Sequence, residues 1–359
     1  MSSITSTPSA SGAVVWGNPQ RKSLFEQWFA SVQTAHGLDP TTLRMASVDA
    51  SFRRYLRVDS SQGSEPISHI IMDAPTDKEN SQPFVHIAQL MQAAGLTVPE
   101  ILAWDEANGF LLLSDLGAKT MLQVIDPAAP PPLNLYLQAV DALVQWQLAS
   151  KESVLPNYDH ALLSRELALF PQWYIGEHRK YTLDAAQQKV LDDAFARIIQ
   201  NNLQWPSVYV HRDFMPRNLM VGPKLGVLDF QDAVYGPITY DIASLMRDAF
   251  LSWDEDFCLD VTIRYWDTAR KAGLPVGDDF GEFYKGVEWM GLQRHLKVAG
   301  IFARLTLRDG KPQYLADTPR FIAYIRSTCS RYMELKPLLR LVEKIEGIEL
   351  PSVFVFGKN

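Results

Sequence analysis

One stretch of the chain carries the residue types and the spacing that phosphoryl transfer requires. A short apolar run leads into the pattern His-x-Asp-x-x-x-x-Asn, formed by His211, Asp213 and Asn218, and a second apolar run ends at Asp229. A carboxylate can receive the proton of an attacking hydroxyl, while an amide and a second carboxylate supply the oxygen ligands that Mg²⁺ prefers. We therefore predict that Asp213 is the catalytic base and that Asn218 and Asp229 hold Mg²⁺, which in turn bridges the phosphates of ATP.

The alternative explanation for this stretch is ordinary turn chemistry, since Asp and Asn are common in loops. A His-x-Asp triplet alone is a weak signal, but the full ordered pattern, followed by an apolar strand that ends in Asp, is much more specific. His211 is expected to support the loop by hydrogen bonding rather than to take part in the reaction.

The elements around this stretch divide the chain into a sheet-rich first part and a helical second part. We expect a flexible tail over residues 1–19, a nucleotide-binding lobe over 20–117, and a helical lobe with the catalytic loop and the substrate site over 118–359, which is an α+β organisation. The apolar periodicity predicts helices over 21–36, 83–94, 133–148, 162–174 and 183–199, and strands over 55–58, 69–72, 101–104, 110–113, 207–210 and 226–230.

Composition and charge narrow the class of protein. The net charge of -7 argues against a nucleic-acid or anionic-membrane partner, both of which need a basic face. The 2 cysteines stand far apart and form no metal-ligand motif. Because no apolar run reaches the length of about 20 residues that spans a bilayer, and no secretory leader is evident, we expect a cytoplasmic protein with no membrane partner.

The catalytic stretch resembles that of the aminoglycoside phosphotransferase-like family of small-molecule kinases. The matching segments are residues 211–218 (HRDFMPRN), 228–233 (LDFQDA) and 240–243 (YDIA). The resemblance implies a bilobal protein-kinase-like fold, with a small antiparallel sheet in the first lobe, a mostly helical second lobe, and ATP in the cleft. Asp241 would then cap a helix or anchor the loop.

A closer resemblance links the chain to the anomeric N-acetylmuramate/N-acetylglucosamine kinases of bacterial cell-wall recycling. It implies transfer of the ATP γ-phosphoryl group to the C1 hydroxyl of an amino sugar, which would be the small-molecule partner besides ATP. The segments that carry this resemblance are residues 49–55, 72–75, 114–117, 292–297 and 300–302.

The nucleotide site is expected in the first lobe, although one usual member is absent. Kinases carry a strand lysine paired with a helix glutamate, but the strand over 69–72 has no lysine and the following helix has no glutamate. We expect Arg53 or Arg54 to supply the charge that faces phosphate, although both could instead be solvated strand residues. Ser51 could contact phosphate through its backbone, and Ser114 and Leu116 would offer backbone groups to adenine.

Five further residues are candidates for substrate contacts, each with a competing explanation. Asp232 could bind metal or a sugar hydroxyl, or could serve a turn. Arg217 could face phosphate, or could form a structural ion pair. Glu177, His178 and Gln293 lie in aromatic-rich helical stretches that could line a sugar site, although for most of these residues a plain helical core with solvated charges is the favoured explanation.

Two other functions remain open at this point. A kinase acting on an aminoglycoside or a choline-type amine would need an acidic pocket, which residues 254–256 could supply. A nucleotide-binding pseudokinase that regulates a partner would explain the missing strand lysine. The complete set of Asp213, Asn218 and Asp229 argues against it, because a protein that only binds nucleotide has no need of a base.

Overall fold

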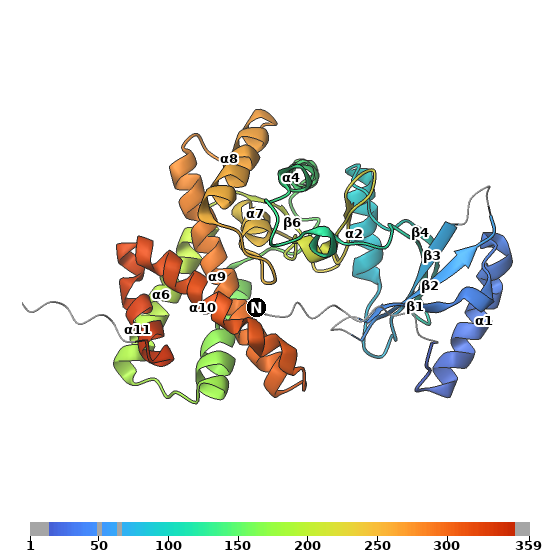
Figure 1. Cartoon of the computed structure of the whole chain (residues 1–359), viewed down its shortest axis with the longest axis horizontal. Helices are drawn as coiled ribbons and strands as arrows, with labels where there is room; N and C mark the ends of the chain where they lie inside the picture. Colours follow the sequence, from blue (N-terminus) through green and yellow to red (C-terminus); the bar gives the residue numbers. More distant parts are fainter. Residues whose placement is uncertain (1–13, 49–51, 63–66, 349–359) are drawn as a thin grey trace, which may run out of the picture. The chain divides into compact units, whose positions relative to one another are not determined.

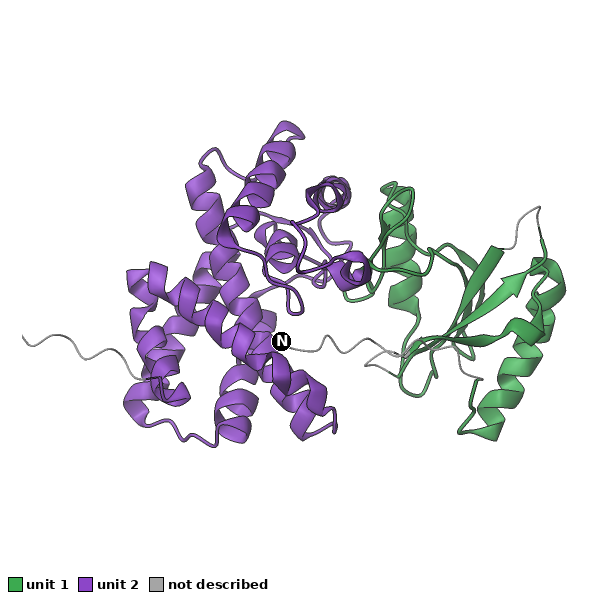
Figure 2. Cartoon of the chain, viewed as in Figure 1, with its two compact units in different colours: residues 1–120, 219–232 green, residues 121–218, 233–359 purple. Residues whose placement is uncertain are grey.

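The computed structural model describes residues 14–48, 52–62 and 67–348 (Figure 1). The chain forms two compact units. Unit 1 comprises Met1–Thr120 and Leu219–Asp232, and unit 2 comprises Met121–Asn218 and Ala233–Asn359 (Figure 2). The short segment 219–232 therefore returns to the first unit after the catalytic loop, so each unit is described by itself below.

Unit 1 is built on a five-stranded antiparallel sheet with the order β1-β2-β3-β5-β4. Alternating apolar residues in β2 place Leu56 and Val58 on one face, as the two-residue period of a strand requires. The strands are β1 (Arg44–Val48), β2 (Arg54–Ser60), β3 (Ile67–Asp73), β4 (Ile101–Asp105) and β5 (Phe110–Ser114).

Helix α1 (Pro19–His36) covers one face of this sheet. Its apolar residues Phe25, Trp28 and Phe29 recur at helical spacing and are buried in one cluster with apolar residues of β2, β3 and β5. The helix begins at Asn18, whose side chain accepts two backbone N–H bonds, and it ends at Gly37 with φ of 59°. Figure 1 shows α1 and α2 (Gln82–Ala93) on different sides of the sheet.

Two short strands, β7 (Leu219–Met220) and β8 (Gly226–Val227), attach the returning segment to unit 1. They pair with each other, Met220 bridges to Thr120, and Gly226 bridges to Thr97. The ring of Phe230 then packs on Phe84 of α2, with centroids 4.8 Å apart. This packing holds the residues around Asp229 within unit 1.

Unit 2 is mostly helical and also contains the pair β6 (Ser207–Val210) and β9 (Val234–Pro237). Its helices are α3 (Met121–Val124), α4 (Leu133–Leu148), α5 (His160–Leu167), α6 (Ala185–Leu203), α7 (Thr239–Met246), α8 (Glu255–Lys271), α9 (Phe280–Leu307), α10 (Thr318–Arg331) and α11 (Lys336–Glu346), with a π-helix η2 (Phe170–His178) and 3-10 turns η3 (Pro216–Asn218), η4 (Pro312–Asp317) and η5 (Met333–Leu335). A further 3-10 turn, η1 (Pro40–Thr42), lies in unit 1. None of the helices in the described ranges is both long and apolar enough to cross a membrane.

Helix α9 is the central element of unit 2. Its 28 residues contact helices on several sides, and side chains such as Phe283, Val287 and Leu296 are fully buried. Gly300 permits a close approach of backbone to this helix, because a Cβ there would stand 2.4 Å from the backbone of Leu169. The helix can therefore carry polar residues, among them Gln293, Arg294 and Lys297, deep into the unit.

The predicted α+β organisation is confirmed: the first part forms the antiparallel sheet and the second is largely helical. The helix over 133–148 has the predicted limits, whereas the helix expected over 162–174 ends at Leu167 and is followed by the π-helix η2. Strands β1, β7 and β9 were not expected, and the strand expected over 226–230 ends at Val227. All are short, so pairing with a neighbouring strand, rather than alternation of side chains, defines their limits.

We predict that Gly300→Ala lowers the free energy of unfolding by about 1–3 kcal/mol, the usual cost of overpacking, because rigid backbone blocks the new methyl group. Gly291→Ala, on the same helix, is the matched control. Its Cβ would meet only the Arg247 side chain at 3.4 Å, and alanine favours a helix by about 0.8–1 kcal/mol over glycine. Urea denaturation of both variants measures the difference. Equal stability of the two variants would contradict the close approach.

Candidate active site

The predicted catalytic loop lies in unit 2, between β6 and η3. His211, which is buried, accepts a hydrogen bond at Nδ1 from the Asp213 N–H at 3.2 Å. Asn218 Nδ2 donates to the carbonyl oxygen of Asp213 at 2.9 Å. Both backbone groups of Asp213 are thus held by loop side chains, while its carboxylate keeps 41% of its side-chain surface exposed. A fixed but accessible carboxylate is what a base for an incoming hydroxyl requires.

A buried carboxylate, Asp241, anchors the start of this loop. Its Oδ2 accepts from the His211 N–H at 2.7 Å and its Oδ1 from the Arg212 N–H at 3.0 Å. Burial raises the pKa of Asp241 to about 6, against the lowering effect of His211 and of the two N–H bonds. Asp241 lies in the first turn of α7 rather than at its cap, so it acts as the loop anchor that the sequence offered as one of two roles.

Three cationic side chains surround Asp213. Arg294 Nη2 lies 3.9 Å from Asp213 Oδ1, and Arg212 is the preceding residue. Burial by itself would raise the pKa of Asp213, but Lys297, Arg294 and Arg212 together hold this pKa below its usual value. The carboxylate is therefore ionised at neutral pH, the form in which it can accept a proton.

The residues predicted to hold Mg²⁺ have the donor chemistry for that ion. Because the Asn218 amide nitrogen faces the Asp213 carbonyl, the amide oxygen is directed to the other side. In unit 1, Asp229 follows β8 with a left-handed φ of 63°, and its Oδ1 accepts a 2.9 Å bond from Gln231 Nε2. The amide oxygen and the oriented carboxylate are each hard oxygen donors of the kind that Mg²⁺ takes in proteins.

Comparison with known proteins gives the family. The model of the phosphotransferase enzyme family matches residues 42–277, which include the catalytic loop and Asp229. The chain belongs to this family. This phosphotransferase is 45% identical over 341 residues to the N-acetylmuramate/N-acetylglucosamine kinase of Neisseria meningitidis serogroup B, with 94% of this chain and 100% of that protein covered. It is 47% identical over 315 residues to the kinase of the same name from Pseudomonas aeruginosa, with 86% and 90% covered.

The fold of this phosphotransferase is also found in solved structures. The crystal structure of the aminoglycoside phosphotransferase APH(2'')-Ib with ADP bound aligns with a TM-score of 0.55 at 13% identity and covers 84% of this chain and 97% of that one. The expected kinase-like fold is thereby confirmed. The family and the relatives together establish that the chain is an enzyme, so the pseudokinase alternative is set aside.

The predicted nucleotide-binding residues all fall in unit 1, although Ser51 lies outside the described residues. Arg53 is buried and pairs with Glu79 at 3.1 Å. Arg54 Nε bonds to the fully buried Asp73 at 3.0 Å, and its guanidinium lies over the Trp16 ring. These pairs give the two arginines different surroundings: Arg53 bonds to Glu79 and to Tyr55, whereas Arg54 binds Asp73 at the end of β3.

Ser114 and Leu116 stand where β5 ends. The Ser114 N–H donates to the Glu100 carbonyl at 2.9 Å, and its hydroxyl accepts from the Glu100 N–H at 2.8 Å. Leu116 packs against Gly226, where a Cβ would come within 2.8 Å of the leucine side chain. With the Ser114 N–H already bonded to Glu100, any adenine contact here must use other backbone groups.

The predicted substrate residues are dispersed. Asp232 is exposed in unit 1. In unit 2, Arg217 is exposed, with its guanidinium 4.6 Å from the centroid of the Phe250 ring. Gln293 has no exposed surface and donates to Glu166 Oε2 at 3.0 Å, which makes it an internal partner of that carboxylate.

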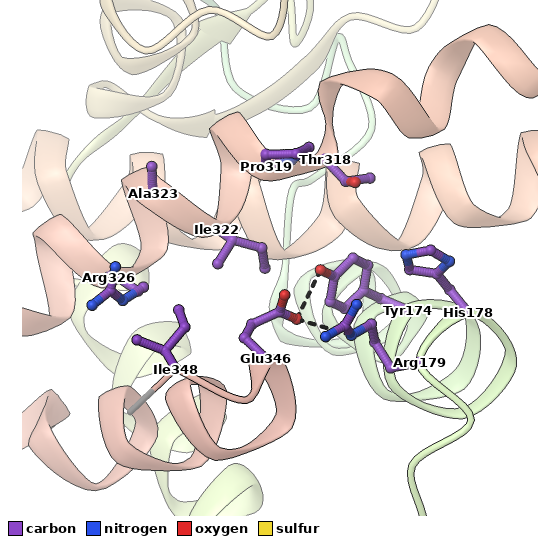
Figure 3. A pocket seen from close by; sticks show the side chains of 10 residues that line it. All are labelled: Tyr174, His178, Arg179, Thr318, Pro319, Ile322, Ala323, Arg326, Glu346 and Ile348. Atoms are coloured by element: carbon purple, nitrogen blue, oxygen red, sulfur yellow. Dashed lines mark hydrogen bonds and ion pairs between the residues drawn. The ribbon is translucent and has the colours of Figure 1, made fainter. Parts of the chain in front are cut away.

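Glu177 and His178 lie at the end of the π-helix η2. Glu177 is exposed and pairs with Lys180 at 3.0 Å. His178 lines a cavity of about 310 Å³ in unit 2, together with residues of α10 and α11 (Figure 3). Inside this cavity Glu346 accepts a bond from the Tyr174 hydroxyl at 2.9 Å and pairs with Arg179. No residue of the catalytic loop lines it.

Some residues near the loop were missed by the sequence reasoning. Arg294 and Lys297 stand three apart on α9, a spacing that places them on one face of the helix, but the sequence does not show that this face meets Asp213. Glu166 is the partner of Lys297 and Arg212. Nothing in the sequence indicated that it is buried, because a glutamate in an amphipathic helix is normally solvated. Glu79 was overlooked because it precedes α2 rather than lying on it.

Proposed function

We propose that this phosphotransferase transfers the γ-phosphoryl group of ATP to the anomeric C1 hydroxyl of N-acetylmuramate and N-acetylglucosamine, a cytoplasmic step in the recycling of peptidoglycan. The sugar class rests on the relatives, which carry that name at 45% and 47% identity over most of both chains. The observation that carries the reaction is the Asp213 carboxylate, ionised and exposed on a loop that fixes its backbone on both sides.

The proposed mechanism relies on position and charge. Asp213 accepts the proton of the sugar hydroxyl and aligns its oxygen for attack on the γ-phosphorus. Asn218 and Asp229 would hold Mg²⁺, which supplies positive charge to the phosphate oxygens as the bond breaks. Asp241 keeps the loop in place throughout, since it binds the two N–H groups just before Asp213. No covalent intermediate is required.

Arg53 is our candidate for the charge that the missing strand lysine would bring. It is paired with Glu79 as the usual lysine is with its glutamate, and the pair stands between the start of β2 and the segment before α2. A paired, positioned guanidinium can donate to phosphate oxygens at little further cost in side-chain entropy. Arg54 is instead committed to Asp73, which it shares with Arg21.

The function is tested by incubating the protein with ATP, Mg²⁺ and one acceptor at a time. We expect ATP consumption with N-acetylmuramate and with N-acetylglucosamine, little with kanamycin or choline, and a product whose phosphorus couples to the anomeric proton in NMR spectra. Transfer to another hydroxyl of these sugars would overturn the anomeric assignment. A preference for kanamycin or choline would overturn the substrate class.

We predict that Asp213→Asn folds and binds ATP but lowers kcat at least about 100-fold, the lower range for loss of a general base. The amide retains the size of the side chain and removes only its ability to take the proton. Asp193→Asn is the control, because Asp193 is exposed on α6 and pairs with Lys189 one turn earlier on the same helix. Near-normal turnover in Asp213→Asn would remove Asp213 from the mechanism.

We predict that Arg53→Ala raises KM for ATP about tenfold or more, as the loss of one charge-assisted contact would. Arg54→Ala should instead lower thermal stability while leaving this KM near that of the parent, because its partner Asp73 is buried in the framework of unit 1. Initial rates against ATP concentration, together with melting curves, distinguish the two effects. An unchanged KM in Arg53→Ala would exclude the phosphate role of Arg53.

A further inference from the structure

The residue directly before the proposed base has an unusual backbone conformation. Arg212 has φ of 77°, in the left-handed region, one of four non-glycine residues with positive φ among the described parts of the chain. This region is unfavourable for a residue with a side chain, and the conformation persists only where the surroundings enforce it. The conformation of Arg212 also sets the direction in which the chain enters Asp213.

Three groups hold Arg212 in this conformation, and each binds a different part of the residue. Its N–H donates to Asp241 Oδ1 at 3.0 Å, and its carbonyl oxygen accepts a bond from Arg294 Nη1. Its guanidinium pairs with Glu166 at 2.6 Å. The first two groups hold the main chain of Arg212, whereas Glu166 acts on the side chain alone.

The Glu166 carboxylate is buried and held in position by several donors, so it can fix the position of the Arg212 guanidinium. The carboxylate comes from α5 and is 6% exposed. It is also bound by Lys297 at 3.0 Å, by Gln293 Nε2 at 3.0 Å and by the Tyr158 hydroxyl. Four donors, two of them from α9, fix the position of this carboxylate, and the positive charges of Lys297 and Arg212 offset the cost of burying it.

We propose that Glu166 is a positioning residue for the phosphoryl transfer: by holding the Arg212 side chain it keeps Arg212 left-handed and so directs the Asp213 carboxylate at the acceptor hydroxyl. The inference rests on the proposed role of Asp213 and adds to it a residue that does not touch the reacting atoms. If Glu166 releases the guanidinium, Arg212 can relax toward negative φ, which turns the following peptide and displaces the base.

The test uses full-length variants, each of which removes one partner of the Glu166–Arg212 ion pair. Glu166→Gln keeps the size of the side chain and removes its charge. Arg212→Met removes the other partner while leaving Glu166 its bonds to Lys297, Gln293 and Tyr158, so it is expected to fold even where Glu166→Gln does not. Glu343→Gln is the matched control: Glu343 is also a buried helical glutamate, but its ion pair, at 2.9 Å, is with Arg326 of α10 rather than with the loop.

We expect Glu166→Gln and Arg212→Met each to lower kcat about 10- to 100-fold, since misplacement of a reacting group by about 1 Å can cost up to 100-fold. KM for ATP and for N-acetylglucosamine should change less than about threefold, because binding contacts are retained. Glu343→Gln should lose a similar amount of thermal stability and keep its kcat. The double variant Glu166→Gln/Arg212→Met should be no slower than Arg212→Met, because both changes interrupt one chain of contacts.

Three results would overturn this inference. They are a parent-like kcat in folded Glu166→Gln or in Arg212→Met, fully additive losses in the double variant, and an equal fall of kcat in Glu343→Gln. Asp213→Asn is measured in the same series. If it retains turnover, the proposed function of Asp213 fails; if it is inactive while Glu166→Gln is not, only the role of Glu166 fails.

Discussion

Two buried carboxylates, Asp241 and Glu166, hold the loop that presents Asp213. Neither can be left without partners inside the protein, because an isolated buried charge is very costly. Each is therefore satisfied by the loop itself: Asp241 by the N–H groups of His211 and Arg212, and Glu166 by the Arg212 guanidinium together with Lys297. Stability of the unit and geometry of the loop thus depend on the same bonds.

Helix α9 connects this electrostatic arrangement with the packing of unit 2. Its apolar residues form the centre of the helical core. From within that core Arg294 reaches the loop, while Gln293 and Lys297 bind Glu166, the partner of Arg212. A polar side chain on a rigid, buried helix has little conformational freedom. It can therefore hold its charged group at one position beside a carboxylate. The small residue at Gly300 lets η2 pack against the same helix.

Unit 1 uses ion pairs in a similar way to fix its sheet. Asp73 at the end of β3 binds both Arg21 of α1 and Arg54 of β2, and Asp115 after β5 binds Arg57 of β2. These pairs join elements whose apolar faces are already packed, so they fix register more than they add stability. The Arg53–Glu79 pair stands apart from them, because it connects the residue just before β2 with the segment that leads into α2.

The sequence by itself determined the fold class and located the loop for which we propose catalysis. Apolar periodicity is local, so it predicted α1, α2, α4 and the hairpin of β4 and β5 close to their observed limits, and the spacing of Asp213 and Asn218 predicted a base beside an amide. The loop-supporting role of His211 followed from the same motif and is confirmed by its bond to the Asp213 N–H.

Only the tertiary structure decided which charges surround that base. Glu166, Arg212, Arg294 and Lys297 come from α5, the loop and α9, and nothing in their local sequence shows that they meet. The same holds for Gln293, which pattern alone left as a sugar contact or a core residue, and which the fold buries against Glu166. Periodicity reports which face of an element is apolar, whereas the partner of a buried charge depends on long-range packing, which no short stretch of sequence contains.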